Sequence, residues 1–152
     1  MADNKAGNLS VDRNDFKFFL PVRVHYADTD AQQVVYYGAY LSFLEAGRQE
    51  YWRRMGLGLN DLMQQGFLLA VVDINCTYFR PAYYDDVLDI YVRTPRLRAS
   101  SCDIEYLVVR RKEDTPVAVA RTVFVFVENK TWKAVPIPEG FRAAVEQFEG
   151  QT

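Results

Sequence analysis

Hydrophobic and polar residues alternate near the start of the chain. Residues 16–26 keep their aromatic and aliphatic side chains on even positions, and these are Phe16, Phe18, Leu20, Val22, Val24 and Tyr26. A period of two is typical of a β-strand with one buried face. Because Pro21 has no amide hydrogen for a central ladder, the pattern predicts an edge strand or a bulged one.

Between Tyr37 and Met55 the apolar spacing changes to three and four residues. The apolar positions of this stretch are Tyr40, Leu41, Leu44, Tyr51, Trp52 and Met55. The spacing predicts a helix over residues 37–55, which is apolar around most of its circumference and therefore favours a sheet curved around it. A Gly-Leu-Gly sequence ends this helix, and Asn60 is predicted to cap a short second helix over residues 61–65.

Four runs with strand-like patterns follow, joined by segments rich in turn residues. They span residues 67–79, 85–96, 100–110 and 116–127. Short turns between successive strands favour antiparallel neighbours, so the chain is predicted to be α+β, with one long helix on an antiparallel sheet. We expect a single domain over residues 16–148, ending in an amphipathic helix at 139–148, after a loose polar tail over residues 1–15.

The composition excludes several classes of function. The net charge of −2 and the lack of a dominant Lys/Arg cluster offer no basic surface to nucleic acid. No apolar run approaches the ~20 residues of a membrane span, and the first residues carry no signal-peptide pattern. Cys76 and Cys102 form no CxxC pair and have no His at zinc spacing, so they are interpreted as small core residues with reduced thiols. We therefore expect a cytoplasmic protein.

The segment VHYADTDAQQVVYYGAY, residues 24–40, places Asp28 and Asp30 beside aliphatic and aromatic residues. Turn chemistry is one explanation, because an Asp at the end of a strand often accepts local backbone amides. A calcium loop that starts at Asp28 would need Gly and Glu where the chain has Gln33 and Ala39. Two carboxylates without a third ligand also make a weak magnesium site, so no metal site is predicted.

A catalytic role is the third explanation. Residues 34–39 contain no Ser, Thr, Asp or Asn to cap the predicted helix, so its first amides have no obvious partner. Free amides at the positive end of a helix stabilise an oxyanion, and the neighbouring valines and tyrosines would make the Asp30 carboxylate more basic. The single histidine, His25, is interpreted as a surface or interface residue rather than a general base, and GxSxG, GxGxxG and P-loop motifs are absent. A carboxylate facing an oxyanion site implies acyl transfer.

The stretch PVRVHYADTDAQQVVYYGAYLSFLEAGRQEYWRRMGL resembles the opening of hotdog-fold acyl-CoA thioesterases of the 4-hydroxybenzoyl-CoA thioesterase type. This family includes bacterial acyl-CoA thioesterases associated with the Tol-Pal system. The segment CTYFRPAYYDDVLDI, residues 76–90, is similar to the second block of these enzymes, and VPIPEGF to their closing segment. The likeness covers residues 18–142. It implies a hotdog fold, in which a curved five-stranded antiparallel sheet wraps around a long helix.

The resemblance also implies roles for individual residues. The second aspartate of the family's D-x-D is catalytic and falls on Asp30, which leaves a structural role for Asp28. The backbone amide of Tyr37 matches the oxyanion donor. The family has Gly where this chain has Gln33, so we expect a looser or differently shaped loop behind the catalytic aspartate.

Substrate-binding positions follow from the same likeness. Tyr40 and Glu45 match residues that line the acyl pocket of aromatic-acyl members. Glu45 has an alternative role as an ordinary helix carboxylate paired with Arg48 or Gln49. The turn that holds the CoA phosphates in such enzymes matches Arg98, Ser100 and Ser101.

The predicted activity is hydrolysis of an acyl-CoA, with a short, medium-length or aromatic acyl group, to a free acid and CoA. Asp30 either activates water or attacks the carbonyl to form an anhydride. No metal or cofactor is expected, and the resemblance implies a homodimer or homotetramer with its active site at a subunit interface. The alternatives are a thioesterase acting on acyl carrier protein or on a quinone-pathway thioester, and a non-catalytic acyl-CoA-binding module.

Overall fold

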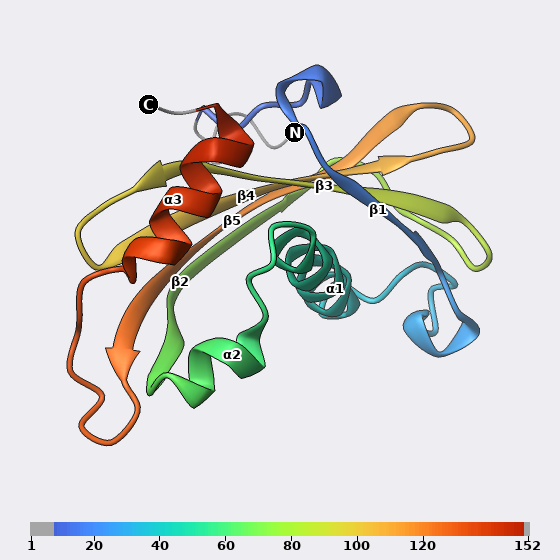
Figure 1. Ribbon diagram of the computed structural model, residues 1–152. Coiled ribbons are helices and arrows are strands. Elements are labelled where there is room, and N and C mark those ends of the chain that lie inside the picture. Colours follow the sequence, from blue (N-terminus) through green and yellow to red (C-terminus); the bar gives the residue numbers. More distant parts are fainter. Residues whose placement is uncertain (1–7, 151–152) are drawn as a thin grey trace.

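Within residues 8–150, the part of the chain that the computed structural model describes, five strands form one antiparallel sheet in the order β1-β3-β4-β5-β2 (Figure 1). The strands are β1 (Phe19–Arg23), β2 (Phe67–Tyr78), β3 (Val87–Leu97), β4 (Ser101–Arg110) and β5 (Thr115–Glu128). β1 and β2 occupy the two edges of the sheet. The predicted antiparallel sheet is confirmed, and Pro21 lies on an edge strand as expected.

Helix α1 (Ala39–Arg54) crosses one face of the sheet, and Figure 1 shows the strands curving around it. The main hydrophobic core forms between this helix and the strand residues that face it. The buried residues of α1 in this core include Tyr40, Phe43, Leu44, Tyr51 and Trp52. Gly47 permits the close approach of helix and sheet, because a Cβ there would lie 2.7 Å from Cγ2 of Ile90 in β3. The predicted curved sheet around a long helix is therefore confirmed.

Glycines set both ends of α1 and the start of α2 (Leu59–Gln64). α1 begins after Gly38 with no side-chain cap, as predicted, and the chain leaves it through Gly56, whose φ of 74° favours glycine. The predicted cap at Asn60 is wrong, because α2 already begins after Gly58 and Asn60 lies inside it. Extended backbone at Gly58 starts the helix earlier than the side-chain pattern indicates.

The first strand is shorter than the alternation over residues 16–26 predicts. β1 ends at Arg23, and Tyr26, which is 80% exposed, begins the 3-10 turn η2 (Tyr26–Asp28). Phe16 lies before the strand and packs on the opposite face of the sheet, with its ring 6.0 Å from that of Tyr91. Phe16 therefore fits the alternating sequence pattern, but it packs on the opposite face of the sheet from Phe18 and Val22, which pack against the main core.

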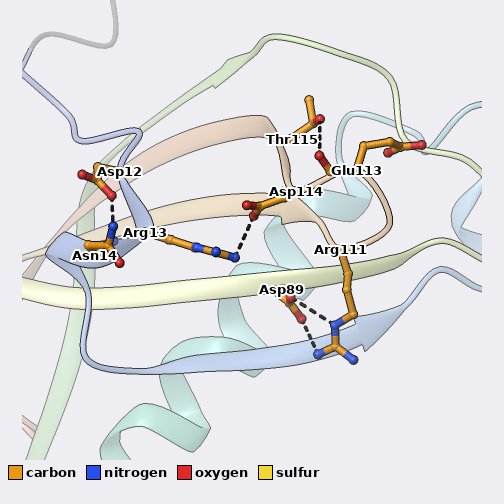
Figure 2. Close-up of polar contacts among 8 residues, drawn as sticks. All are labelled: Asp12, Arg13, Asn14, Asp89, Arg111, Glu113, Asp114 and Thr115. Atoms are coloured by element: carbon orange, nitrogen blue, oxygen red, sulfur yellow. Dashed lines mark hydrogen bonds and ion pairs between the residues drawn. The ribbon is translucent and has the colours of Figure 1, made fainter.

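A second, smaller hydrophobic cluster covers part of that opposite face and contains Phe16, Tyr91, Leu107, Val109 and Val119, with Leu9 packed against it. Beside the β4–β5 turn, Arg13 of η1 (Arg13–Asp15) pairs with Asp114 at 2.8 Å, and Arg111 pairs with Asp89 of β3 at 2.7 Å (Figure 2). Within residues 8–15 of the predicted tail, Leu9 therefore packs against the sheet and Arg13 contacts the β4–β5 turn. Residues 1–7 of that tail lie outside the described part of the chain.

The last helix, α3 (Glu139–Glu149), matches the predicted amphipathic helix and packs Phe141 against Trp52 of α1. Glu149 fastens its end to α1 and β3, because its carboxylate accepts from the Tyr51 hydroxyl and, at 3.1 Å, from the Thr94 amide. Burial and the neighbouring Glu149 carboxylate raise the pKa of Tyr51, so its phenol stays a donor. Among the helices of residues 8–150, none combines the length and the hydropathy that a membrane crossing needs.

Candidate active site

A short hairpin, residues 28–36, carries both aspartates of the DTD segment to the start of α1. The Tyr36 amide donates to the carbonyl of Asp28 at 2.8 Å. The Val35 amide donates to the carbonyl of Ala82 at 2.8 Å, which fastens the hairpin to the connection between β2 and β3. Backbone hydrogen bonds therefore close the hairpin on itself and fasten it to the β2–β3 connection.

Asp28 holds local backbone in place. Its Oδ2 accepts the amide of His25 at 2.8 Å and closes η2 in the manner of a capping box. The His25 side chain is exposed, as the sequence predicts. This contact is the one that turn chemistry predicts for an aspartate at the end of a strand.

Asp30 lies exposed at the tip of the hairpin. Its Oδ1 accepts the Gln32 amide at 2.8 Å, and Oδ2 has no protein partner among the described residues. Val35 turns into the core at 5% exposure while the tip projects outward, so a single chain does not provide the apolar surroundings predicted for this carboxylate. Across residues 8–150, no group of three or more His, Cys, Asp or Glu side chains is arranged to hold a metal ion.

Gln33 adopts the backbone conformation that favours glycine. Its φ is 65°, and its amide donates to the carbonyl of Asp30 at 2.9 Å. The turn behind Asp30 is therefore closed by a backbone hydrogen bond, and the looser or differently shaped loop expected from the missing glycine stays a prediction. A left-handed conformation costs a non-glycine residue about 1–2 kcal/mol, which the surrounding hydrogen bonds offset.

Within the described part of the chain, two backbone donors lack partners where α1 begins. The Tyr36 amide is engaged by Asp28, and the Ala39 amide donates to the carbonyl of Tyr36 at 2.9 Å. Between them, the amides of Tyr37 and Gly38 make no hydrogen bond within the described residues. The first turn of α1 also has no acidic residue to neutralise the positive end of the helix. Free amides at the positive end of a helix can hold an anion, and the role of the Tyr37 amide as an oxyanion donor stays a prediction.

A cavity of about 300 Å³ has Tyr37 in its wall, and it is lined by Val35, Tyr37, Tyr40, Tyr78, Phe79, Arg80 and Pro81. The Tyr78 hydroxyl donates to the carbonyl of Tyr37 at 2.9 Å, and the Tyr78 and Tyr40 rings meet edge to face at 5.1 Å. Burial raises the pKa of Tyr40 to about 12 and also raises the pKa of Tyr78, so both phenols are neutral near pH 7. Arg80 is therefore the one charged side chain among the residues that line the cavity. Its positive charge favours a ligand with a negatively charged group.

Glu45 lies on α1 and pairs with Arg48, with Oε2 and Nη2 2.5 Å apart. The buried guanidinium of Arg48 lies 4.6 Å from the ring centroid of Trp52 and 4.7 Å from that of Phe124. The ordinary helix ion pair considered as an alternative for Glu45 is thus present. The Glu45 side chain is 49% exposed, and its role in an acyl pocket stays a prediction.

Arg98, Ser100 and Ser101 lie at the far end of the sheet from Tyr37. β3 begins shortly after Ala82, which the hairpin contacts, and Arg98 directly follows the last residue of β3. At ~3.3 Å per residue, the length of this strand separates Arg98 from the hairpin end of the sheet by roughly 30 Å. Arg98 binds Asp103 through Nη1 to Oδ1 at 2.6 Å and Nη2 to Oδ2 at 3.1 Å, and this pairing raises the pKa of Arg98. Within one chain these residues do not join the Tyr37 cavity, and their role in binding CoA stays a prediction.

Sequence reasoning missed Tyr78, Phe79 and Arg80 as site residues. The hydrogen bond between Tyr78 and Tyr37 joins positions 41 residues apart, and periodicity within one element contains no signal for such a contact. The available signal was an aromatic pair directly before Arg-Pro at the end of a predicted strand.

The chain is similar to several known proteins. Residues 24–145 match the sequence model of a family described as the thioesterase-like superfamily. A putative esterase of Aquifex aeolicus is 32% identical over 117 residues, which are 77% of this chain and 88% of that protein. The acyl-CoA thioester hydrolase YbgC of Escherichia coli O6:H1 is 31% identical over 134 residues, 88% of this chain and 99% of that protein. A solved 1,4-dihydroxy-2-naphthoyl-CoA thioesterase from Synechocystis shares the fold, with a TM-score of 0.80 and 24% identity over 84% of this chain and 94% of that one.

Proposed function

The chain belongs to the thioesterase-like superfamily, and from this membership we propose that it hydrolyses acyl-CoA thioesters to a free acid and CoA. The observation that carries the proposal is the pair of amides of Tyr37 and Gly38, which have no partner among the described residues. They lie beside an aromatic cavity and directly follow the hairpin that carries Asp30. Membership of the narrower 4-hydroxybenzoyl-CoA thioesterase type is part of the same proposal.

The free amides stabilise the charge that thioester cleavage creates. As the acyl carbon becomes tetrahedral, negative charge develops on the carbonyl oxygen, and one preorganised donor contributes about 2.7–4 kcal/mol to such a transition state. The Tyr37 amide meets the requirement, because it has no competing acceptor in the described chain and lies at the positive end of α1. Arg80 adds a positive charge to the wall of the same cavity.

Asp30 supplies the base or the nucleophile. As a base, Oδ2 takes a proton from water while the water oxygen bonds to the acyl carbon; the C–S bond then breaks and the CoA thiolate is protonated. As a nucleophile, Oδ2 itself bonds to the acyl carbon and expels the thiolate, and water hydrolyses the resulting anhydride. Oδ2 has no partner among residues 8–150, so either route leaves the hydrogen bond between Oδ1 and Gln32 intact.

The proposal includes assembly with a second copy of the chain. β2 pairs with β5 along one side, and its other side has no partner within residues 8–150. Val71, Val72 and Ile74 on this edge strand are 56%, 59% and 44% exposed, and an apolar unpaired edge is a template for another strand. Pairing of β2 with its copy covers the unpaired strand edge and the exposed apolar side chains. It gives a homodimer, and two such dimers form a homotetramer.

We also expect a cytoplasmic location.

A thiol-release assay tests the activity. The purified protein is mixed with short, medium, long and aromatic acyl-CoAs, and with thioesters of acyl carrier protein at matched concentrations. Release of CoA from any of these acyl-CoAs supports the proposal, and a preference for carrier-protein thioesters supports the alternative substrate. A non-catalytic module would bind acyl-CoA in an equilibrium titration without releasing thiol.

Light scattering on a size-exclusion column tests the assembly. The wild type is expected to elute at a multiple of 17.6 kDa, and Val72→Lys is expected to reduce that mass by placing a charge on the exposed edge. Met63→Lys is the matched control, because Met63 is 46% exposed but lies on α2. A monomeric wild type contradicts the proposed dimer.

A further inference from the structure

The peptide planes at the start of α1 are held from their carbonyl sides. Every peptide bond within residues 8–150 is trans, so each carbonyl points opposite to the amide hydrogen of the same plane. The Tyr36 carbonyl accepts the Ala39 amide at 2.9 Å and thereby sets the direction of the Tyr37 amide. Whatever binds the Tyr37 carbonyl sets the direction of the Gly38 amide in the same way.

The partner of the Tyr37 carbonyl is a side chain from the sheet. The hydroxyl of Tyr78, the last residue of β2, donates to it at 2.9 Å. The Tyr78 ring packs against Tyr40, which is 2% exposed and belongs to α1, so the anchor is tied to the sheet and to the helix. A phenol is protonated at neutral pH, and burial together with the neighbouring Cys76 side chain raises the pKa of Tyr78 further, so its hydroxyl remains a donor.

We propose that Tyr78 is a positioning residue of the oxyanion site and that it orients the Tyr37–Gly38 peptide so that the Gly38 amide serves as a second donor beside that of Tyr37. The inference rests on the proposed thioesterase function. The hydroxyl of Tyr78 is occupied by the Tyr37 carbonyl, so it acts on the reaction through this peptide. Removing the hydroxyl keeps both amides but frees the peptide to rotate.

Tyr78→Phe tests the proposal, and Tyr84→Phe is its matched control. Both changes remove one phenol hydroxyl, but Tyr84 is 59% exposed and its hydroxyl has no hydrogen bond within the described residues. Loss of a complete oxyanion donor lowers kcat about 10²- to 10³-fold, so misorientation of one donor is expected to lower it about tenfold. KM is expected to stay within about twofold, because ground-state binding is not altered. Unchanged kcat in Tyr78→Phe overturns the positioning role.

An NMR measurement gives a readout that does not depend on turnover. The Gly38 amide resonance is expected to shift in Tyr78→Phe and to stay in place in Tyr84→Phe, and an unshifted resonance overturns the inference. A fall in kcat that is matched by a lower melting temperature and a higher KM indicates a general structural role and also overturns it. If the wild type releases no CoA from any thioester, the proposed function itself is wrong. If the wild type is active and Tyr78→Phe is equally active, only the positioning role of Tyr78 is wrong.

Discussion

The Asp28 carboxylate accepts the His25 amide at 2.8 Å, so the first aspartate of DTD is committed to the backbone that leads into the hairpin. We predict that Asp28→Ala lowers the free energy of unfolding by about 1 kcal/mol, the usual cost of losing a capping side chain. Asp28→Asn is expected to lose less, because its side-chain oxygen still accepts the amide. Urea denaturation measures both variants, and an Asp28→Ala protein as stable as the wild type contradicts this role.

Gln33 is predicted to be a point where glycine stabilises the protein. Its φ of 65° lies in the left-handed region, where a side chain costs about 1–2 kcal/mol and glycine costs little. Gln33→Gly should therefore raise the free energy of unfolding by up to about 1 kcal/mol after the greater flexibility of the unfolded chain is subtracted. Gln32→Gly is the control, since Gln32 is not in this region, and it should destabilise. The same sign of change in both variants would count against the strain at Gln33.

Gly47→Ala tests the close packing of α1 on the sheet. An added Cβ would lie 2.7 Å from Cγ2 of Ile90 and 3.2 Å from Cγ2 of Val92, and both residues are fully buried. We expect a loss of about 1–3 kcal/mol, which exceeds the gain of about 1 kcal/mol that alanine brings to a helix interior. In Gly140→Ala of α3 the added Cβ meets no atom of the described residues within 4 Å, so this variant should not be destabilised. Thermal unfolding of the two variants decides between packing and helix propensity.

Glu128 is predicted to make the stability depend on pH in the acidic range. Its carboxylate accepts the Lys130 amide at 3.0 Å, and the hydroxyl and amide of Thr131 at 2.8 Å each, and these bonds lower its pKa. The stabilisation is therefore present above the unfolded value of about 4.3 and disappears as the pH falls through the lower folded value. Glu128→Gln should be less stable than the wild type at pH 7, and the difference should shrink below pH ~4. Melting temperatures from pH 3 to 7 measure this, and a difference that grows on acidification has the wrong sign.

The sheet and α1 could be predicted because their signals are local. Alternation marks β4 and β5, and the spacing of Tyr40, Leu44 and Tyr51 marks the helix. The ends of elements could not be predicted so well. Phe16 continues the alternation of β1 but packs on the other face of the sheet, and only tertiary packing determines which face receives a side chain.

In the candidate site, too, the local features could be predicted from the sequence and the tertiary contacts could not. The uncapped start of α1 was visible in the sequence, and no residue between 8 and 150 provides an acceptor for the Tyr37 amide there. The contact of Tyr78 with this residue depends on β2 crossing beside the helix, which local pattern does not encode. The exposure of Asp30 and the separation of Arg98 from Tyr37 likewise follow from the tertiary arrangement of the chain, which local pattern does not encode.

The most direct test of the central claim compares the kcat of Asp30→Asn with that of the wild type on the best acyl-CoA substrate. A catalytic base contributes about 10²- to 10⁴-fold, so Asp30→Asn should lose at least about 100-fold in kcat while its melting temperature stays close to that of the wild type. Asp85→Asn is the control, an exposed aspartate at φ 70° that pairs with Arg23 outside the cavity, and it should keep full activity. An Asp30→Asn protein that turns over as fast as the wild type contradicts the mechanism.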